Sequence, residues 1–208
     1  MSVIFRKMNE KEITEIYETR MTKDFPPMEL KPLHNIIDMM EQGIYESLLV
    51  YDQEPVGYAL VLLPKGISYG LLDYLGTFSE KRNQGYGGLI LKELMTYYQD
   101  RRLMIESEYP DDAPDRRMAA RRLQFYQRNS AVDTGVESRI FGAHYINLVL
   151  SGQQKNMNFV LPMAVSSAEL LAVPPAEEVK DILIQLYTGM LPDEEKRKKY
   201  LDFWIKKR

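Results

Sequence analysis

The stretch Arg82-Asn83-Gln84-Gly85-Tyr86-Gly87-Gly88 decides the fold of this chain. It lies between a strand-like segment, 71–77, and a helix-like segment, 89–95. Three glycines in four positions at a helix start expose backbone N–H groups, and the helix dipole adds partial positive charge there. The stretch therefore predicts a phosphate or pyrophosphate site. A tight strand-to-helix turn is the alternative interpretation.

Composition limits the function classes that need to be considered. The chain has 208 residues, of which 45% are hydrophobic, and a formal net charge of −3, which argues against a dedicated nucleic-acid binder. Cysteine is absent, so disulfides and thiolate chemistry are excluded. There is no secretory signal pattern and no run of about 18 apolar residues. We expect a cytoplasmic protein with no membrane or nucleic-acid partner.

Hydrophobic spacing on both sides of the glycine stretch predicts the order of elements. Before it we expect a strand at 3–8, a helix capped by Asn9, a proline-containing loop at 24–32, a helix at 33–43, and strands at 45–51, 56–63 and 68–77. After it we expect a helix to about 100, a strand at 103–108, a helix at 115–129, and strands at 134–140 and 144–150. This β-αα-βββ-α-β-α-ββ order predicts a mixed α/β sheet with helices on both faces.

The end of the chain differs in composition from the rest. We expect one domain over 1–151 and a mostly helical C-terminal extension over 152–208, joined by the polar linker 153–156. One helix follows Pro174-Pro175, and a highly charged helix opens at Pro192 and ends in Tyr200, Leu201, Phe203 and Trp204. The extension is expected to pack on the core or on a second subunit, which would make a homodimer.

The order of elements and the residues of the loop together resemble the GNAT superfamily of acyl-CoA-dependent N-acetyltransferases, of bacterial type. The signature of that family is Arg/Gln-x-x-Gly-x-Gly/Ala between its fourth strand and third helix, and it is met here by 82–87. The resemblance extends from about Val3 to Leu150. It implies acetyl-CoA as co-substrate and no metal. His34 and His144 are the only histidines, and both are expected to be structural.

The resemblance also implies where the co-substrate would bind. The pyrophosphate would lie on the backbone of Arg82, Asn83, Gln84, Gly85, Tyr86 and Gly87. The pantetheine arm would pair with Leu75, Gly76 and Thr77, where the strands 68–77 and 103–108 splay apart.

A tyrosine on the fourth helix of many such enzymes protonates the departing thiolate. Tyr126 matches that position and is the candidate general acid, although a half-buried packing role is the alternative. The chain departs from the family pattern near Ala119, where an Asn often touches the cofactor, and at Ser130-Ala131, which replaces Gly-Phe.

Acyl transfer to an amine needs a neutral amine, so a carboxylate that accepts its proton is a candidate base. Asp73, Glu106 and Glu108 lie nearest the expected splay, and strand alternation places Glu106 and Glu108 on one face. Pairing with neighbouring arginines is the alternative, and several enzymes of the family need no dedicated base.

The loop that joins the first two helices often shapes the acceptor pocket in the family. Phe25 and Glu29 are therefore candidate acceptor-binding residues, and Glu29 would attract a cationic amine. A rigid surface turn with Phe25 buried is equally compatible with the sequence.

The sequence thus predicts an N-acetyltransferase that transfers an acetyl group from acetyl-CoA directly to a primary amine, either a small amine or a peptide amine. The competing hypothesis is a catalytically silent acyl-CoA-binding module, acting as a sensor or assembly subunit on the same fold. A nucleotide-binding protein is disfavoured because Gly-x-x-x-x-Gly-Lys-Ser/Thr is absent. The sequence does not identify the acceptor.

Overall fold

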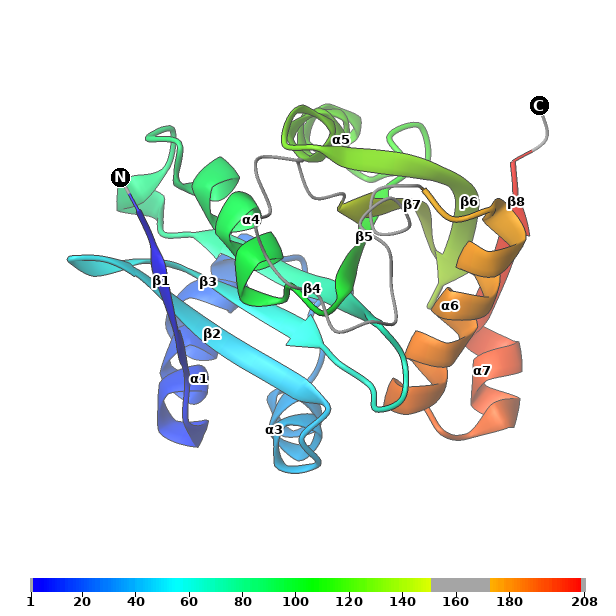
Figure 1. The fold of residues 1–208 in the computed structure, drawn as a ribbon, viewed down its shortest axis with the longest axis horizontal. Helices are drawn as coiled ribbons and strands as arrows, with labels where there is room; N and C mark the ends of the chain where they lie inside the picture. The colour runs from blue at the N-terminus through cyan, green and yellow to red at the C-terminus, as the bar shows by residue number, and fades with distance from the viewer. Residues whose placement is uncertain (1, 151–172, 207–208) are drawn as a thin grey trace.

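An eight-stranded mixed sheet organises the chain, with strand order β1-β2-β3-β4-β5-β7-β6-β8 (Figure 1). The computed structural model describes residues 2–150 and 173–206. The strands are β1 (Ile4–Lys7), β2 (Tyr45–Asp52), β3 (Glu54–Leu62), β4 (Tyr69–Thr77), β5 (Arg102–Glu108), β6 (Ala131–Ile140), β7 (Ala143–Leu150) and β8 (Leu201–Ile205).

Seven α-helices are found in the described part of the chain. They are α1 (Glu10–Ile16), α2 (Thr22–Asp24), α3 (Leu33–Glu41), α4 (Tyr86–Tyr97), α5 (Arg116–Arg128), α6 (Ala176–Met190) and α7 (Glu194–Tyr200). Asn9 caps α1 in a capping box with Glu12, as the sequence indicates. A wider π turn joins α1 to α2, and a short 3₁₀ turn at Ser79–Lys81 precedes the glycine stretch. None of the helices in 2–150 and 173–206 has the length and apolarity that crossing a bilayer requires.

The helices cover both faces of the sheet, which confirms the predicted fold class (Figure 1). On one face, α1, α3 and α6 enclose a core that contains Ile13, Leu60 and Leu183. On the other face, α4 and α5 enclose a second core that contains Ile90 and Ile105. Alternation along the strands explains this division, because successive side chains point to opposite faces of a sheet.

The two central strands diverge part-way along their length. β4 and β5 are parallel and pair from Tyr69 with Arg102 to Leu72 with Ile105. Beyond that point β4 stays paired with β3, and β5 stays paired with β7. The predicted splay between 68–77 and 103–108 is therefore confirmed, and it leaves one side of the second half of β4 open.

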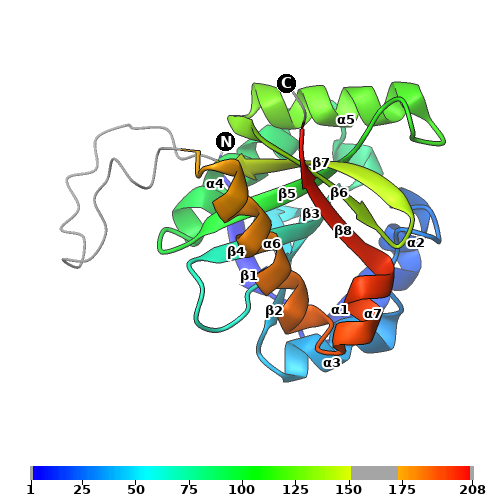
Figure 2. The same ribbon diagram turned by 90° about the vertical axis from the view of Figure 1, so that its right-hand side faces the viewer.

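The C-terminal extension packs on the sheet of its own chain. Val179 and Leu183 of α6 are fully buried in the core, and Figure 2 shows α6, α7 and β8 together at one side of the molecule. The predicted linker at 153–156 and the predicted boundary between 151 and 152 lie outside the described residues.

The prediction that the last helix continues through Phe203 and Trp204 is wrong. α7 ends at Tyr200, and the following residues form β8, which pairs antiparallel with β6. β6 would otherwise be an edge strand with unpaired backbone groups, and β8 satisfies them. Phe203 is buried against Tyr187 of α6. Phe203 and Trp204 therefore belong to a strand, whereas Tyr200 is the last residue of α7.

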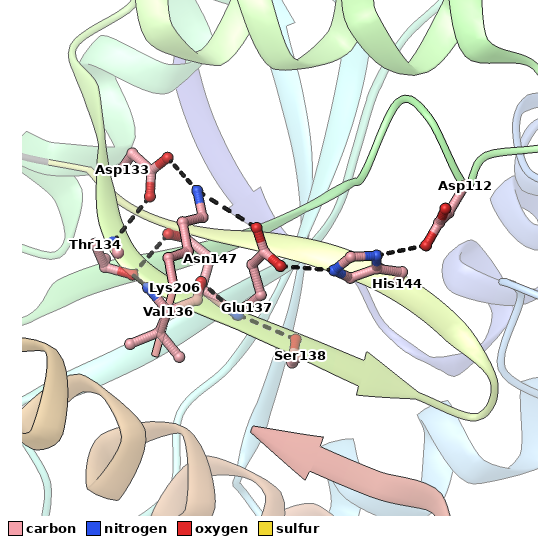
Figure 3. A network of polar contacts seen from close by, with 10 residues as sticks. Asp112, Asp133, Thr134, Val136, Glu137, Ser138, His144, Asn147 and Lys206 are labelled. Atoms are coloured by element: carbon pink, nitrogen blue, oxygen red, sulfur yellow. Dashed lines mark hydrogen bonds and ion pairs between the residues drawn. The ribbon is translucent and has the colours of Figure 1, made fainter. Parts of the chain in front are cut away.

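A polar network fastens the strands β6, β7 and β8 to the loop before α5 (Figure 3). The His144 ring contacts Asp112 Oδ2 at 2.7 Å through Nδ1 and Glu137 Oε2 at 3.0 Å through Nε2. Lys206, which follows β8, lies 2.6 Å from Asp133 Oδ2 and 3.7 Å from Glu137 Oε1. His144 thus joins separate segments of the fold, in line with its expected structural role.

Gly76 in β4 offers a test of the packing that shapes the open side of this strand. The Tyr58 ring from β3 lies directly over Gly76, and a Cβ at this position would overlap it. We expect Gly76→Ala to lower the free energy of unfolding by about 1–3 kcal/mol through overpacking, measured by urea denaturation. Thr77→Ala, which adds no atoms, is the control and is expected to cost less than about 1 kcal/mol. Equal stabilities of the two variants would contradict this packing.

Candidate active site

The loop between the 3₁₀ turn and α4 presents free backbone N–H groups. Asn83 and Gly85 have left-handed backbone angles, with φ of 61° and 86°. Within the described part of the chain, the N–H groups of Asn83, Gln84 and Gly85 have no hydrogen-bond partner. The first N–H groups of any helix are also free, so those at the start of α4 add to the same set. We call this set of free N–H groups the cradle; free N–H groups at a helix start are the kind of site that binds phosphate groups.

The Arg82 side chain holds this loop in place. Its Nε donates to the Thr77 carbonyl at 3.2 Å, and its guanidinium pairs with Asp24. Asp24 also accepts a hydrogen bond from the Tyr58 hydroxyl at 2.7 Å. Arg82 thus links the cradle to β4 and α2. Its backbone N–H donates to the Ser79 carbonyl at 3.4 Å, so the predicted backbone contact of Arg82 to the pyrophosphate stays a prediction.

Packing between helices provides a second reason for the glycines at the start of α4. A Cβ at Gly87 would lie 3.0 Å from Phe125 Cζ, and one at Gly88 would lie 2.5 Å from Asn129 Oδ1. These positions therefore need small residues so that the C-terminal part of α5 can approach. The Tyr86 side chain is buried and donates to Asp52 Oδ2 at 3.0 Å, so only its backbone can serve the cradle.

The open side of β4 continues from the cradle. Leu75, Gly76 and Thr77 pair with β3 on one side, and within residues 2–150 and 173–206 no strand pairs with them on the β5 side. Unpaired backbone groups of this kind require a partner. The predicted pantetheine contacts therefore lie at an edge that can accept an extended ligand as an additional strand.

A single cavity of about 1540 Å³ contains both the cradle and the open edge of β4. The loop before α3, the ends of β4 and β5, α5 and the C-terminal end of α6 form its walls. Of the predicted site residues, all except Gln84 line this cavity. The fold therefore brings together candidates that lie about 100 residues apart in the sequence.

Tyr126 of α5 is a buried residue that lines the cavity. Its side chain is only 8% exposed, and its hydroxyl has no hydrogen-bond partner among the described residues although it lines the cavity. Burial raises the pKa of Tyr126, the nearby Arg122 opposes this shift, and Glu29 adds to it. The hydroxyl therefore stays protonated at neutral pH and is free to donate to a ligand.

Arg122 lies one helical turn before Tyr126 and joins two of the candidate carboxylates. Its Nη1 is 3.1 Å from Glu108 Oε2 and 3.6 Å from Glu29 Oε2. Burial and the adjacent Glu108 raise the pKa of Glu29, while Arg122 opposes the shift. For Glu108, pairing with an arginine was the alternative to a role as base, and the structure shows such a pair.

Asp73 and Glu106 are the first residues beyond the last paired positions of β4 and β5, so they flank the point where the strands diverge. Asp73 accepts hydrogen bonds from Lys31 Nζ at 2.8 Å and from the Tyr45 hydroxyl. Glu106 has no ion-pair partner in 2–150 and 173–206, and the Tyr187 hydroxyl contacts its two oxygens at 3.0 and 2.8 Å. Burial raises the pKa of Glu106 to about 7.

The loop with Phe25 and Glu29 is both packed and part of the cavity wall. Phe25 makes an edge-to-face contact with Tyr74, with ring centroids 4.9 Å apart. The Tyr74 hydroxyl donates to the Glu29 carbonyl at 2.8 Å and accepts from the Lys31 N–H at 2.8 Å. Phe25 and Glu29 are partly buried and both line the cavity, so an acceptor-binding role for this loop stays a prediction.

No family model matches the sequence, and no curated protein matches it. Solved structures do match the fold. A protein assigned to the GNAT acetyltransferases from Bacteroides thetaiotaomicron is 19% identical, with a TM-score of 0.64 over 89% of this chain and 96% of that chain. A GNAT-family protein from Desulfovibrio desulfuricans is 20% identical, with a TM-score of 0.54 over 72% and 98%. Spermidine N-acetyltransferase from Vibrio cholerae, solved with CoA and spermine, is 8% identical, with a TM-score of 0.54 over 71% and 94%.

The chain has the GNAT acetyltransferase fold. Residues 1–151 are about 73% of the 208, so the match over 89% must include part of the C-terminal extension. The matches that cover 71% and 72% of this chain span about as many residues as the predicted domain 1–151 without the extension. Within the described ranges of this GNAT fold, no group of three His, Asp or Glu side chains is arranged to hold a metal ion.

Several polar residues that surround the candidate carboxylates in the GNAT cavity were not predicted as site residues. They include Lys31, Arg122, Tyr145 and Tyr187. Arg122 could have been predicted from the sequence, because residues four apart on a helix lie on the same face and Tyr126 is a candidate site residue. Tyr187 had none, since no local pattern tells which strand residue a distant helix will meet.

The cradle can be tested through Gly85, which has φ of 86° and open space where a Cβ would lie. A side chain there strains the backbone by about 1–2 kcal/mol, so we expect Gly85→Ala to raise the Kd for CoA by about tenfold, measured by calorimetry. Gly43→Ala is the control, because Gly43 has φ of 68° at the end of α3, outside the cavity. An unchanged Kd in Gly85→Ala would refute the assignment of the cradle.

Proposed function

We propose that this protein is an N-acetyltransferase that moves an acetyl group from acetyl-CoA to a primary amine. One observation carries the proposal: the N–H cradle, the part of β4 beyond its pairing with β5, and Tyr126 all line one cavity. The GNAT fold of the chain supports it. The cradle would hold the pyrophosphate, and Leu75–Thr77 would hold the pantetheine arm.

The bound co-substrate would supply an acetyl group activated as a thioester. In the overall transfer the C–S bond breaks, a C–N bond forms, the amine loses a proton and the sulfur gains one. Tyr126 would donate the proton to the sulfur, because its hydroxyl is protonated and unpartnered. Binding both reactants in one cavity lowers the entropic part of the barrier.

Of the three candidate bases, we propose that Glu106 accepts the proton of the amine. Asp73 is neutralised by Lys31, and Glu108 is paired with Arg122. Glu106 has no cationic partner in the described chain, and its pKa of about 7 is close to the value at which a base works well near neutral pH. It also lies at the point where β4 and β5 diverge, next to the open edge.

The cavity as a whole is lined by both acidic and basic side chains, but the charges around the point where β4 and β5 diverge support a cationic acceptor. Asp73, Glu29, Glu106 and Glu108 line it, and two cations, Lys31 and Arg122, pair with members of this set. An ammonium group would be attracted to the remaining negative charge. The structural neighbour from Vibrio cholerae binds spermine, which supports an amine as the acceptor class. A panel of small and peptide amines, with CoA release as the readout, identifies the acceptor and separates an enzyme from a silent binding module.

Tyr126→Phe tests the proposed proton donor. The phenyl ring keeps the packing, so we expect unchanged CoA affinity and melting temperature. Loss of the acid should lower kcat by about 10²-fold or more, measured by CoA release at saturating amine. A kcat within twofold of wild type would leave Tyr126 with a packing role only.

The pH dependence of kcat/KM tests Glu106. A base must be unprotonated, so activity should rise with pH through about 7, and Glu106→Gln should remove most of the activity. The folded pKa lies above the ordinary 4.5, so the stability that Glu106 contributes is present at low pH and is lost as pH rises through about 7. We therefore expect Glu106→Gln to be more stable than wild type at pH 8 and closer to it at pH 5. Full activity of this variant would exclude Glu106 as the base.

A further inference from the structure

The C-terminal helix α6 reaches the centre of the cavity although it lies outside the predicted acetyltransferase domain. Tyr187, Met190 and Leu191, at the end of α6 and just after it, line the cavity. Of these, Tyr187 is 2% exposed and makes the polar contact to Glu106.

The contact between Tyr187 and Glu106 constrains the whole carboxylate. The hydroxyl is 3.0 Å from Oε1 and 2.8 Å from Oε2, so it engages both oxygens. The Glu106 backbone is held from the other direction by pairing with Asn147 of β7. Because the backbone and the side chain are both held, the carboxylate has little freedom to rotate.

Tyr187 is itself held by close packing. Its ring contacts Phe203 of β8, with centroids 5.9 Å apart. Two residues later, α6 lies so close to the loop after β3 that a Cβ at Gly189 would be 2.9 Å from Pro64 Cβ. The helix and β8 together therefore place the hydroxyl as a rigid unit.

We propose that Tyr187 is a positioning residue that orients the Glu106 carboxylate toward the acceptor amine, so that the C-terminal extension is part of the active site. This inference rests on the proposed function, in which Glu106 accepts a proton from the amine. It gives the segment beyond residue 151 a role in the chemistry in addition to its packing role.

The hydrogen bond from Tyr187 also affects the charge state of the base. The titratable groups facing Glu106 are Asp73 of β4, Lys31, Tyr145 of β7 and Tyr187. Burial and Asp73 raise the pKa of Glu106, whereas the Tyr187 hydroxyl and Lys31 lower it. Removing the hydroxyl should therefore raise this pKa and move the acidic limb of kcat/KM to higher pH.

Tyr187→Phe tests the inference because it keeps the ring and removes the hydroxyl. Loss of one hydrogen bond to a charged group costs enough free energy to change a rate constant by about tenfold. We therefore expect kcat to fall by about tenfold with little change in KM, and the acidic limb to move up by about one pH unit. In the Glu106→Gln background the same substitution should have almost no further effect, since it acts through Glu106.

Tyr98→Phe is a matched control. The buried Tyr98 also donates to a glutamate, Glu46 Oε2 at 2.9 Å, but this pair lies outside the cavity. We expect it to alter stability and leave kcat and the pH profile unchanged. Two results would overturn the inference without affecting the proposed acetyl transfer. One is a Tyr187→Phe variant that, like Tyr98→Phe, keeps the kcat and pH profile of wild type. The other is a loss of kcat in Tyr187→Phe that adds fully to the loss in Glu106→Gln. Absence of CoA release by the wild type with every amine would refute the proposed function, and this inference with it.

Discussion

The divergence of β4 and β5 is the constraint on which the rest of the site depends. Parallel strands that separate leave backbone donors and acceptors without partners, and such groups are costly unless something satisfies them. Here the pairing ends at Leu72 and Ile105, and the open side of β4 runs to Thr77. The cradle begins a few residues later. An extended ligand with an anionic end would therefore satisfy both the open side of β4 and the free N–H groups of the cradle.

The same divergence explains the unusual electrostatics of the cavity. Asp73 and Glu106 are the first residues after the paired part of each strand, so two carboxylates lie where the backbone opens. Lys31 compensates Asp73, whereas Glu106 receives a neutral hydroxyl from Tyr187. A buried carboxylate without a cation holds its proton more tightly. In this environment Glu106 can gain and lose a proton near neutral pH, but burial of its charged form lowers the stability of the fold.

The C-terminal extension satisfies another open edge. β8 pairs with β6, and the buried Phe203 supports Tyr187 on α6. One segment thus covers an exposed strand and carries a hydroxyl into the cavity. Packing and chemistry are linked here because the strand that protects the sheet also holds the helix that meets Glu106.

Sequence alone determined the order of elements through residue 150 and the glycine-rich start of α4, because these depend on local patterns: hydrophobic periodicity and glycines at a helix start. The divergence of the central strands was predicted from the family resemblance. The family resemblance also led to Tyr126, Glu106 and Glu29 as separate site candidates. Only the tertiary structure showed that Glu108 pairs with Arg122, that Phe203 and Trp204 form a strand, and that Tyr187 contacts Glu106. Each of these depends on contacts between segments far apart in the chain. Local propensity is silent about such contacts, because burial and pairing with a distant partner decide them.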